Sequence, residues 1–375
     1  MTSAAIQIDQ LYFSPPGGIG TYVRNLVPAL AAQDPSLDVA LFHARFGRGQ
    51  QPPERWVRDF WVEELPASIR SLYPRWNLLG MPRLPSSLRS REVLHATSPA
   101  AIPPKSRDQR LVVTVHDLAF EEFPAAFNRT WRTMFRQGLR ATVRRADAII
   151  TPSRNTAEDL LSYTDVDPTR VHVIPLAASL EASPVDPDPT LDRLGISRPY
   201  VFFLGTLERR KNLLRLVRAY RRLAATGAPH SLVLTGAMGW GSDELLREIE
   251  LPGPGHVIRT GELGPADLDA VFRAASVFVY PSVYEGFGLP VLEAMVRGIP
   301  TVCSNTSSLP EVVGDAALTV DPKSVSEISE ALAHLVSDHA LAEKLSEKAR
   351  ARAERFSWAE TARRTLQLYE KAGVE

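Results

Sequence analysis

The stretch Ser276–Glu293, SVFVYPSVYEGFGLPVLE, carries the strongest structural signal in the sequence. Its apolar run at 277–280 is typical of a buried strand. Pro290 suits the first position of a helix, where the missing N–H of proline is no loss. A strand, a glycine-containing turn and a helix are therefore predicted in that order, with Glu285 in the turn and Glu293 in the first turns of the helix.

The two glutamates and the glycines between them indicate a ligand with two chemical parts. The free N–H groups and the positive dipole end of a helix N-terminus attract phosphate, and Gly286 and Gly288 allow the backbone to come close to it. The carboxylates of Glu285 and Glu293 accept hydrogen bonds, which sugar hydroxyls donate. The stretch therefore predicts a site for a ligand that carries both phosphate and sugar.

This stretch resembles the nucleotide-sugar motif of the retaining glycosyltransferases of family 4, in which two glutamates enclose seven residues. The internal run GFGLP and the preceding YPS at 280–282 make the match stronger than the spacing alone. The resemblance implies the α/β GT-B fold, with two Rossmann-like domains whose parallel sheets face each other across a cleft. It also implies that Glu293 binds the ribose hydroxyls and that Glu285 faces the hexose and the phosphate edge. The further donor contacts that it implies here are Phe287, Gly288 and Leu289.

Length and composition are those of a globular protein of two domains. A chain of 375 residues exceeds what one hydrophobic core usually serves. Its formal net charge of zero argues against a nucleic-acid partner. The N-terminus does not read as a signal peptide, and no run reaches the roughly 18 apolar residues of a membrane span, so we expect a cytoplasmic protein. The single cysteine, Cys303, lies in a predicted strand and is expected to be a small core residue.

Two series of short apolar runs alternate with helix-compatible stretches. The first series lies at 4–8, 39–43, 93–96, 111–115, 148–150 and 171–174, and the second at 200–204, 232–234, 257–258, 277–280, 301–302 and 318–320. This alternation predicts two parallel sheets covered by helices. We expect a first domain at 1–180, a proline-rich acidic linker at 181–199 and a second, donor-binding domain at 200–357. By resemblance, a C-terminal helix at 358–375 returns to the first domain.

A glycine-rich segment follows the first predicted strand. Gly17, Gly18 and Gly20 precede an amphipathic helix and could expose backbone N–H groups to an anion. A dinucleotide-binding fingerprint would need a third glycine where this chain has Val23, which weakens a dehydrogenase interpretation. The resemblance implies that Gly17 and Gly18 face the donor diphosphate; a plain tight turn is the alternative.

The segment 205–212, GTLERRKN, follows the first strand of the second domain. The resemblance implies that Arg210 and Lys211 bind the diphosphate, with Gly205 and Thr206 beside the donor. A guanidinium binds two phosphate oxygens and an ammonium adds a movable point charge, so the pair can stabilise a leaving group that gains negative charge. Arg209 stands where relatives carry proline and could share this role. The alternative is a solvated basic turn.

His116 follows the strand at 111–115, at the carboxyl edge where open parallel sheets bind ligands. The resemblance implies a position beside the transferred sugar, without a role as general base, because the leaving phosphate itself is thought to take the acceptor proton. A structural histidine is the alternative. Asp117 could orient His116 or cap the segment that follows.

Other donor contacts rest on the resemblance alone. Gly261 falls where relatives hold the nucleotide base, and the loop 304–311 falls near the diphosphate and sugar. No metal site is expected: the pairs at 165/167 and 186/188 match an Asp-x-Asp pattern but lie in turn or linker sequence, so they are interpreted as turn formers.

Two segments of the first domain could serve other partners. The stretch 129–145 predicts an amphipathic helix with a basic stripe, formed by Arg129, Arg132, Arg136, Arg140 and Arg144. This stripe is either a solvated face or a surface that docks on anionic lipid or on a phosphate-bearing acceptor. The aromatic stretch 56–88 either helps to form the acceptor region or belongs to the core.

The sequence therefore predicts a metal-independent retaining hexosyltransferase that needs no cofactor besides its nucleotide-sugar donor. The variant GTLE-x-RKN resembles that of bacterial mannosyltransferases, which favours GDP-mannose over a UDP-hexose. The acceptor would be a glycan, a lipid-linked sugar or a small molecule, and the protein could lie peripherally at the inner face of the cell membrane. The alternatives are a nucleotide-sugar epimerase of the same architecture and a non-catalytic protein that binds sugar nucleotides.

Overall fold

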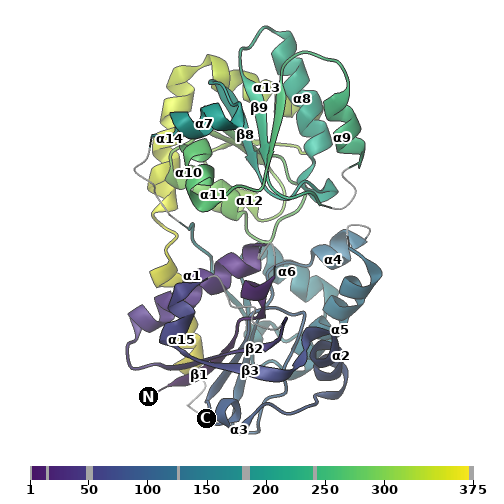
Figure 1. Cartoon of the computed structure of the whole chain (residues 1–375), viewed down its shortest axis with the longest axis vertical. Coiled ribbons are helices and arrows are strands. Elements are labelled where there is room, and N and C mark those ends of the chain that lie inside the picture. The colour runs from purple at the N-terminus through teal and green to yellow at the C-terminus, as the bar shows by residue number, and fades with distance from the viewer. Residues whose placement is uncertain are drawn as a thin grey trace. The chain divides into compact units, whose positions relative to one another are not determined.

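The computed structural model describes residues 2–13, 17–47, 54–124, 127–179, 186–239 and 243–370. The chain divides into two compact units: Met1–Ala177 with Ser357–Glu375 forms unit 1, and Ala178–Phe356 forms unit 2. Each unit contains one parallel sheet with helices packed around it (Figure 1). The predicted α/β class with two Rossmann-like sheets is confirmed.

The seven strands of unit 1 follow the order β3-β2-β1-β4-β5-β6-β7. Their bounds are β1 Ser3–Gln7, β2 Asp38–Arg45, β3 Trp61–Ser68, β4 Val93–Ala96, β5 Arg110–Thr114, β6 Ala148–Thr151 and β7 Val171–Val173. The helices are α1 Gly17–Gln33, α2 Ile69–Leu79, α3 Ser86–Arg89, α4 Ala119–Glu122, α5 Arg129–Arg145, α6 Arg154–Tyr163 and α15 Trp358–Glu370. Strand order reverses between β1 and β4, and ligands of such sheets bind at the carboxyl ends beside this point.

The six strands of unit 2 follow the order β10-β9-β8-β11-β12-β13. Their bounds are β8 Tyr200–Leu204, β9 Ser231–Thr235, β10 Val257–Gly261, β11 Val277–Tyr280, β12 Thr301–Ser304 and β13 Leu318–Val320. The helices are α7 Asp188–Leu194, α8 Leu213–Ala225, α9 Asp243–Glu250, α10 Pro265–Arg273, α11 Leu289–Val296, α12 Leu309–Val313, α13 Val325–Ser337 and α14 His339–Ala353. Strand order reverses here between β8 and β11.

Two elements differ from the sequence prediction. The stretch 56–88 contains β3, an edge strand in which Leu65 alone is fully buried and which includes Pro66, so it lacks the apolar run of a buried strand. Residues 181–185 of the predicted linker lie outside the described residues, but 186–199 contains α7, which has Pro189 in its first turn and the left-handed Gly195 as its C-cap. These two residues are ordinary helix-end signals that the composition of the segment concealed.

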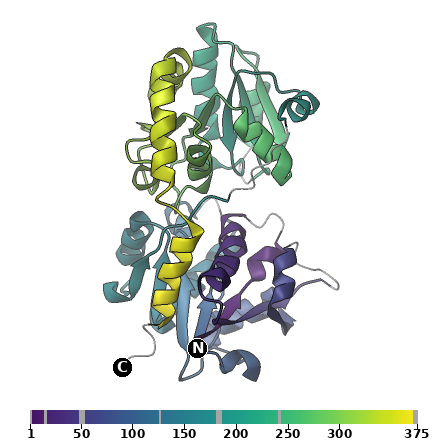
Figure 2. The same cartoon turned by 90° about the vertical axis from the view of Figure 1, so that its left-hand side faces the viewer.

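Helix α15 belongs to unit 1, where it packs against α1 (Figure 2). Its buried side chains include Ala362, Leu366 and Tyr369, which lie at the predicted helical spacing. The Tyr369 hydroxyl lies 2.6 Å from Nδ1 of His95, and His95 Nε2 lies 2.8 Å from Oγ1 of Thr114. A buried polar chain therefore fixes this helix to the core of the sheet. The last predicted residues of the helix, 371–375, lie outside the described part.

Cys303 is fully buried in β12, as expected for a small core residue. Its burial raises the pKa of the thiol to about 12. None of the described helices is long and apolar enough to cross a bilayer.

Candidate functional site

The predicted donor residues of unit 2 gather at the carboxyl ends of β8 and β11, where the strand order reverses. Gly205 follows β8 and leads into a short 3-10 helix at Arg209–Lys211, while β11 leads through 281–288 into α11. Because β8 and β11 are adjacent, segments about 75 residues apart in sequence are brought together. Arg210 and Lys211 thus meet Glu285.

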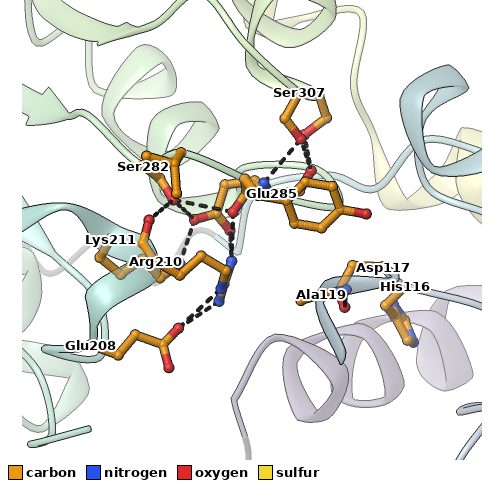
Figure 3. A network of polar contacts seen from close by, with 12 residues as sticks. His116, Asp117, Ala119, Glu208, Arg210, Lys211, Ser282, Glu285 and Ser307 are labelled. Atoms are coloured by element: carbon orange, nitrogen blue, oxygen red, sulfur yellow. Dashed lines mark hydrogen bonds and ion pairs between the residues drawn. The ribbon is translucent and has the colours of Figure 1, made fainter. Parts of the chain in front are cut away.

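These three side chains form an ion cluster in which Lys211 and Glu285 are buried and Arg210 is mostly buried (Figure 3). Lys211 Nζ donates to Glu285 Oε1 at 2.6 Å, and Arg210 Nη1 lies 3.0 Å from Glu285 Oε2. Arg210 also pairs with Glu208 at 2.8 Å, and Lys211 donates to the hydroxyl of Tyr280 at 2.6 Å. Glu285 therefore orients both cations, and Glu208 orients Arg210 as well.

The charge state of Glu285 follows from these neighbours. Burial by itself would raise the pKa of Glu285, but the charges of Arg210 and Lys211 and the hydrogen bonds from Lys211 and Ser282 outweigh it and lower the pKa to about 2. Glu285 is thus a fixed anion. Burial and the charge of Arg210 lower the pKa of Lys211, against the attraction of Glu285.

Hydroxyl groups hold Glu285 from both sides. Ser282 Oγ donates to its carboxylate at 2.5 Å. From the loop after β12, Ser307 Oγ accepts from the Glu285 N–H at 3.0 Å, and Ser307 and Ser308 both donate to its carbonyl, at 2.6 and 2.9 Å. The loop 304–311 therefore positions this turn. The roles of Glu208, Tyr280 and Ser282 were not predicted: Glu208 and Ser282 contact partners two and three residues away, whereas Tyr280 meets Lys211 because β8 and β11 are adjacent.

Glycine backbone lines the same sheet edge. Gly205 and Gly236 lie so close that a Cβ built on Gly236 would be 2.2 Å from the Gly205 carbonyl oxygen. The Gly236 N–H donates to the carbonyl of Gly261 at 2.9 Å. Gly261 itself is exposed, with a φ of +72° and open space beside it. The structure thus places Gly205 and Gly261 along one edge, with Gly236 between them, while Thr206 is half-buried beside Gly205.

Glu293 occupies a different environment from Glu285. It lies in the second turn of α11, is partly buried, and its carboxylate has no hydrogen-bond partner among the described residues. Burial raises its pKa to about 7, against the charge of Arg297. A desolvated carboxylate without a partner has accepting capacity that ligand hydroxyls can satisfy.

The turn before α11 has little room to change. Gly288 has a φ of +102°, and a Cβ there would be 2.5 Å from Cδ2 of the buried Leu309. Phe287 is buried and packs edge-on against Phe356 at 5.8 Å, whereas Leu289 is partly exposed. Arg209 is exposed, unlike Arg210 and Lys211.

The remaining predicted residues lie in unit 1. His116 is partly buried after β5, and its Nε2 lies 2.9 Å from the carbonyl oxygen of Thr97. A carbonyl only accepts, so Nε2 carries the proton and Nδ1 is left as an acceptor. Burial lowers the pKa of His116, which keeps the ring neutral. Asp117 caps the next helix, because its Oδ1 accepts from the N–H of Ala119 at 3.0 Å (Figure 3).

Gly17 and Gly18 form the exposed first turn of α1, and added Cβ atoms there would meet open space. One turn later, Tyr22 packs edge-on against His116, with 4.9 Å between ring centroids. The start of α1 and His116 therefore lie on the same side of unit 1. Pro15 and Pro16, which precede the glycines, lie outside the described residues.

In each acidic pair that matches Asp-x-Asp, one aspartate side chain stabilises a turn by accepting a backbone hydrogen bond. Asp167 Oδ1 accepts from the N–H of Thr169 at 2.9 Å, and Asp186 Oδ1 from the N–H of Asp188 at 3.1 Å. Across the described ranges, no three His, Cys, Asp or Glu side chains gather as a metal-binding group.

The family model described as Glycosyltransferase Family 4 matches residues 16–182, and that described as Glycosyl transferases group 1 matches residues 193–352. O-antigen chain mannosyltransferase B of Escherichia coli is 32% identical over 364 residues, which cover 94% of this chain and 95% of that protein. The chain belongs to glycosyltransferase family 4. It is therefore a transferase enzyme, and the epimerase and the non-catalytic binding protein find no support among these relatives.

Other similar proteins agree with this family membership. MMP alpha-(1->4)-mannosyltransferase of Mycolicibacterium hassiacum is 31% identical, covering 70% of this chain and 65% of that protein. Sucrose-phosphate synthase from Thermosynechococcus elongatus has a TM-score of 0.75 at 21% identity, with 99% of each chain covered. HepE of Anabaena, solved in complex with UDP-glucose, has a TM-score of 0.75 at 17% identity, covering 99% of this chain and 100% of that one. These structural likenesses confirm the GT-B fold of this family 4 member.

Proposed function

We propose that this family 4 glycosyltransferase moves a hexose from a nucleotide diphosphate sugar to a glycan, a glycolipid or a small-molecule acceptor, with retention of configuration and without a metal ion. The observation that carries the proposal is the buried cluster of Arg210, Lys211 and Glu285. Buried, pre-positioned cations stabilise negative charge more strongly than cations in water, because their orientation costs nothing at the moment of reaction.

The cluster suits a leaving nucleoside diphosphate. As the bond between the hexose and the phosphate oxygen breaks, charge accumulates on the diphosphate, which Arg210 and Lys211 would neutralise. The new bond to the acceptor oxygen forms on the same face of the sugar, and the acceptor proton passes to the leaving phosphate. Glu208 pairs with Arg210, so a donor phosphate oxygen that binds this guanidinium would compete with the carboxylate.

The other predicted contacts complete this proposal. Glu293 would accept from the ribose hydroxyls, and Glu285 would face the hexose and the phosphate edge. Backbone groups at Gly205 and Gly261 would face the donor, with Gly261 beside the base. In unit 1, neutral His116 would accept from a sugar hydroxyl through Nδ1. The remaining proposed donor contacts are Gly17, Gly18, Thr206, Phe287, Gly288 and Leu289.

Mannose is favoured as the transferred sugar because mannosyl transfer is named in both relatives described above. GDP-mannose is accordingly the first proposed donor and a UDP-hexose the second. We further propose a cytoplasmic location with peripheral contact at the inner face of the cell membrane.

A donor-binding experiment tests the proposal. Thermal unfolding is measured with GDP, UDP, ADP and their hexose conjugates, since a ligand that binds only the folded state raises the transition temperature. We expect the largest increase with GDP and GDP-mannose. Glu293→Ala should reduce this increase, whereas Arg222→Ala, an exposed arginine of α8, should leave it unchanged.

Turnover separates the roles of the cations from binding. We expect Lys211→Ala to lower the rate of GDP release from GDP-mannose by at least about a hundredfold, while the thermal increase with GDP-mannose largely persists. Activity should survive treatment with EDTA, and NMR should show the donor's anomeric configuration in the product. Wild-type binding and turnover in both Glu293→Ala and Lys211→Ala would show that the site is misplaced.

A further inference from the structure

A turn on unit 1 presents three large apolar side chains to solvent. Leu78 is 60% exposed, Leu79 72% and Met81 52%, and we call these three residues the α2 tip. Gly80 between them adopts a left-handed conformation that ends α2, with its N–H donating to the carbonyl of Trp76. The indole of buried Trp76 donates to the carbonyl of Pro82 at 3.0 Å. The tip is therefore held in a fixed shape by the core beneath it.

Two segments that meet beside the α2 tip are rich in arginine and contain no carboxylates of their own. The segment 69–91 contains five arginines and no Asp or Glu, and α5 contains six arginines and again no Asp or Glu. The helices α2 and α5 pack against each other (Figure 1). The exposed arginines on these two segments are Arg70, Arg75, Arg83, Arg89, Arg129, Arg140 and Arg144.

The basic stripe predicted on α5 is only partly free. Arg136 forms an ion pair with Glu121 of α4, so the middle of the helix is already neutralised. Towards the end of α5, Arg140 and Arg144 are exposed, and Arg144 Nη2 lies 3.4 Å from the carbonyl oxygen of Asn77 beside the α2 tip. Three of the six arginines of the helix, Arg140, Arg144 and Arg145, therefore lie at the end of α5 that is next to the apolar turn.

An open basic pocket of about 580 Å³ adjoins the α2 tip. It is lined by Gly80, by the cations Lys105, Arg144, Arg145 and Arg170, and by one carboxylate, Asp147. Arg145 lies directly against the turn, because a Cβ built on Gly80 would be 3.4 Å from its Nη1.

Hydrogen bonds fix the cations of this pocket. Arg145 donates to the carbonyl of Ile102 at 2.6 Å, and Arg170 donates to the carbonyl of Ala146 at 2.8 Å. Asp147 balances only one of the four cations, since it pairs with Lys105 at 2.5 Å. The pocket thus carries an excess of positive charge on side chains that are already oriented.

This surface is separate from the candidate active site. Asp147 immediately precedes β6, and Lys105 precedes β5, so the pocket lies at the amino ends of these strands. His116 follows the carboxyl end of β5, at the opposite edge of the same parallel sheet.

We propose that the α2 tip and its basic surroundings dock on an anionic phospholipid bilayer. The leucines and the methionine would enter the boundary between headgroups and acyl chains, while the arginines and Lys105 contact lipid phosphates. Either signal alone gives weak membrane affinity, and the combination of apolar insertion and positive charge gives stable attachment. A second copy of the chain is a poor partner, because a symmetric contact would set the arginine-rich surface against itself without carboxylates.

The test measures binding of the full-length protein to vesicles by co-sedimentation, with no donor or acceptor present, so its result is independent of the proposed reaction. Wild type should bind vesicles of phosphatidylcholine with phosphatidylglycerol and bind pure phosphatidylcholine at least about fivefold more weakly. Leu78→Ser/Leu79→Ser should weaken binding to the mixed vesicles about tenfold or more. Arg83→Glu should weaken it at least about fivefold and make it less sensitive to salt.

Matched controls lie on unit 2. Leu251 is 54% exposed, and Leu251→Ser removes a comparable apolar side chain there. Arg222→Glu reverses an exposed arginine. Both controls should bind the mixed vesicles as the wild type does, and every variant should keep the wild-type thermal unfolding transition in the absence of vesicles.

Three results would overturn the proposal. The first is that Leu78→Ser/Leu79→Ser binds vesicles to the same extent as the wild type, including the case in which neither protein binds. The second is sedimentation equilibrium that shows a dimer in the wild type and a monomer in this variant, which would assign the tip to self-association. The third is stabilisation by inorganic phosphate or pyrophosphate that Arg145→Gln abolishes while vesicle binding is unaffected, which would make the pocket a site for a free anion.

Discussion

Two glutamates eight positions apart in one turn-helix segment have opposite ionisation behaviour. Glu285 is surrounded by Arg210, Lys211 and Ser282, and its pKa falls to about 2. Glu293 is partly buried without a hydrogen-bonding partner among the described residues, and its pKa rises to about 7. At neutral pH one is a permanent anion and the other is close to half-protonated. Ligand hydroxyls that donate to Glu293 should therefore bind more tightly as the pH rises through 7.

Glu293→Gln should stabilise the ligand-free protein in alkaline solution. The folded pKa of about 7 lies above the ordinary value of 4.5, so folding favours the protonated carboxyl, and this contribution is lost as pH rises through 7. The neutral amide avoids the loss. We expect an increase in the free energy of unfolding of about 1 to 3 kcal/mol at pH 8 and almost none at pH 4.

Urea unfolding curves at the two pH values check this expectation, with Glu293→Ala as a second variant that also lacks the charge. The same substitution should weaken GDP-mannose binding at pH 8. Equal unfolding free energies for wild type and Glu293→Gln at pH 8 would mean that the carboxyl is not desolvated.

The site residues could be predicted from sequence only where they belong to one continuous motif. Glu285, Glu293 and the glycines between them are recognisable because local order fixes their relation. The contact of Glu285 with Arg210 and Lys211 depends on β8 and β11 being neighbours, which is a property of strand order and not of local sequence. The positioning hydroxyls of Ser307 and Ser308 come from a third segment for the same reason.

Among the elements, the connection from β11 to α11 is conformationally restricted. Its left-handed Gly288 allows the chain to turn sharply into the helix, and Leu309 of α12 fills the space where a side chain would stand. The carboxylates on either side of this turn keep their separation because the turn cannot relax.

Gly288→Ala should destabilise unit 2 by about 1 to 3 kcal/mol, because φ of +102° is strained for alanine and its Cβ would overlap Leu309. Thermal unfolding measures the loss. Gly18→Ala is the matched comparison, since it meets open space in the first turn of α1, and it should be neutral or stabilising by up to about 1 kcal/mol. Equal stability of the two variants would contradict the crowding at 288.

Strands and helices could be predicted from the sequence where burial alone determined the pattern of apolar residues. Buried parallel strands are apolar throughout, so most strands could be read from the sequence. The edge strand β3 has one exposed face, contains Pro66 and resembles a loop in composition. Helix α7 lies among prolines, and only its capping residues distinguish it from a linker.

On the scale of the whole molecule, the attachment of α15 to unit 1 depends on a polar chain in a dry core. Burial lowers the pKa of His95 to about 3, with a smaller contribution from His116. A depressed pKa favours the neutral ring in the folded state, so its contribution to stability is present above the ordinary value of 6.5 and is lost as the pH falls towards 3. Unit 1 should therefore be sensitive to mild acid.

Tyr369→Phe should weaken unit 1 selectively. The substitution keeps the ring but leaves Nδ1 of His95 without its partner, which should cost about 1 to 3 kcal/mol. Differential scanning calorimetry with and without GDP identifies the transition of unit 2, since GDP should raise that transition. We expect the other transition to move to lower temperature in Tyr369→Phe. An equal shift of both transitions would show that α15 does not act as an anchor for unit 1 alone.

The return of the chain to unit 1 through α15 has a consequence for biosynthesis. Unit 2 is inserted between two parts of unit 1, so a ribosome completes unit 2 before it has made the helix that carries Tyr369. His95 and the surface of α1 that α15 covers must wait for that helix. All seven strands of the first sheet precede unit 2 in the chain, so the sheet can form early while the surface of α1 that α15 covers stays exposed until that helix is made.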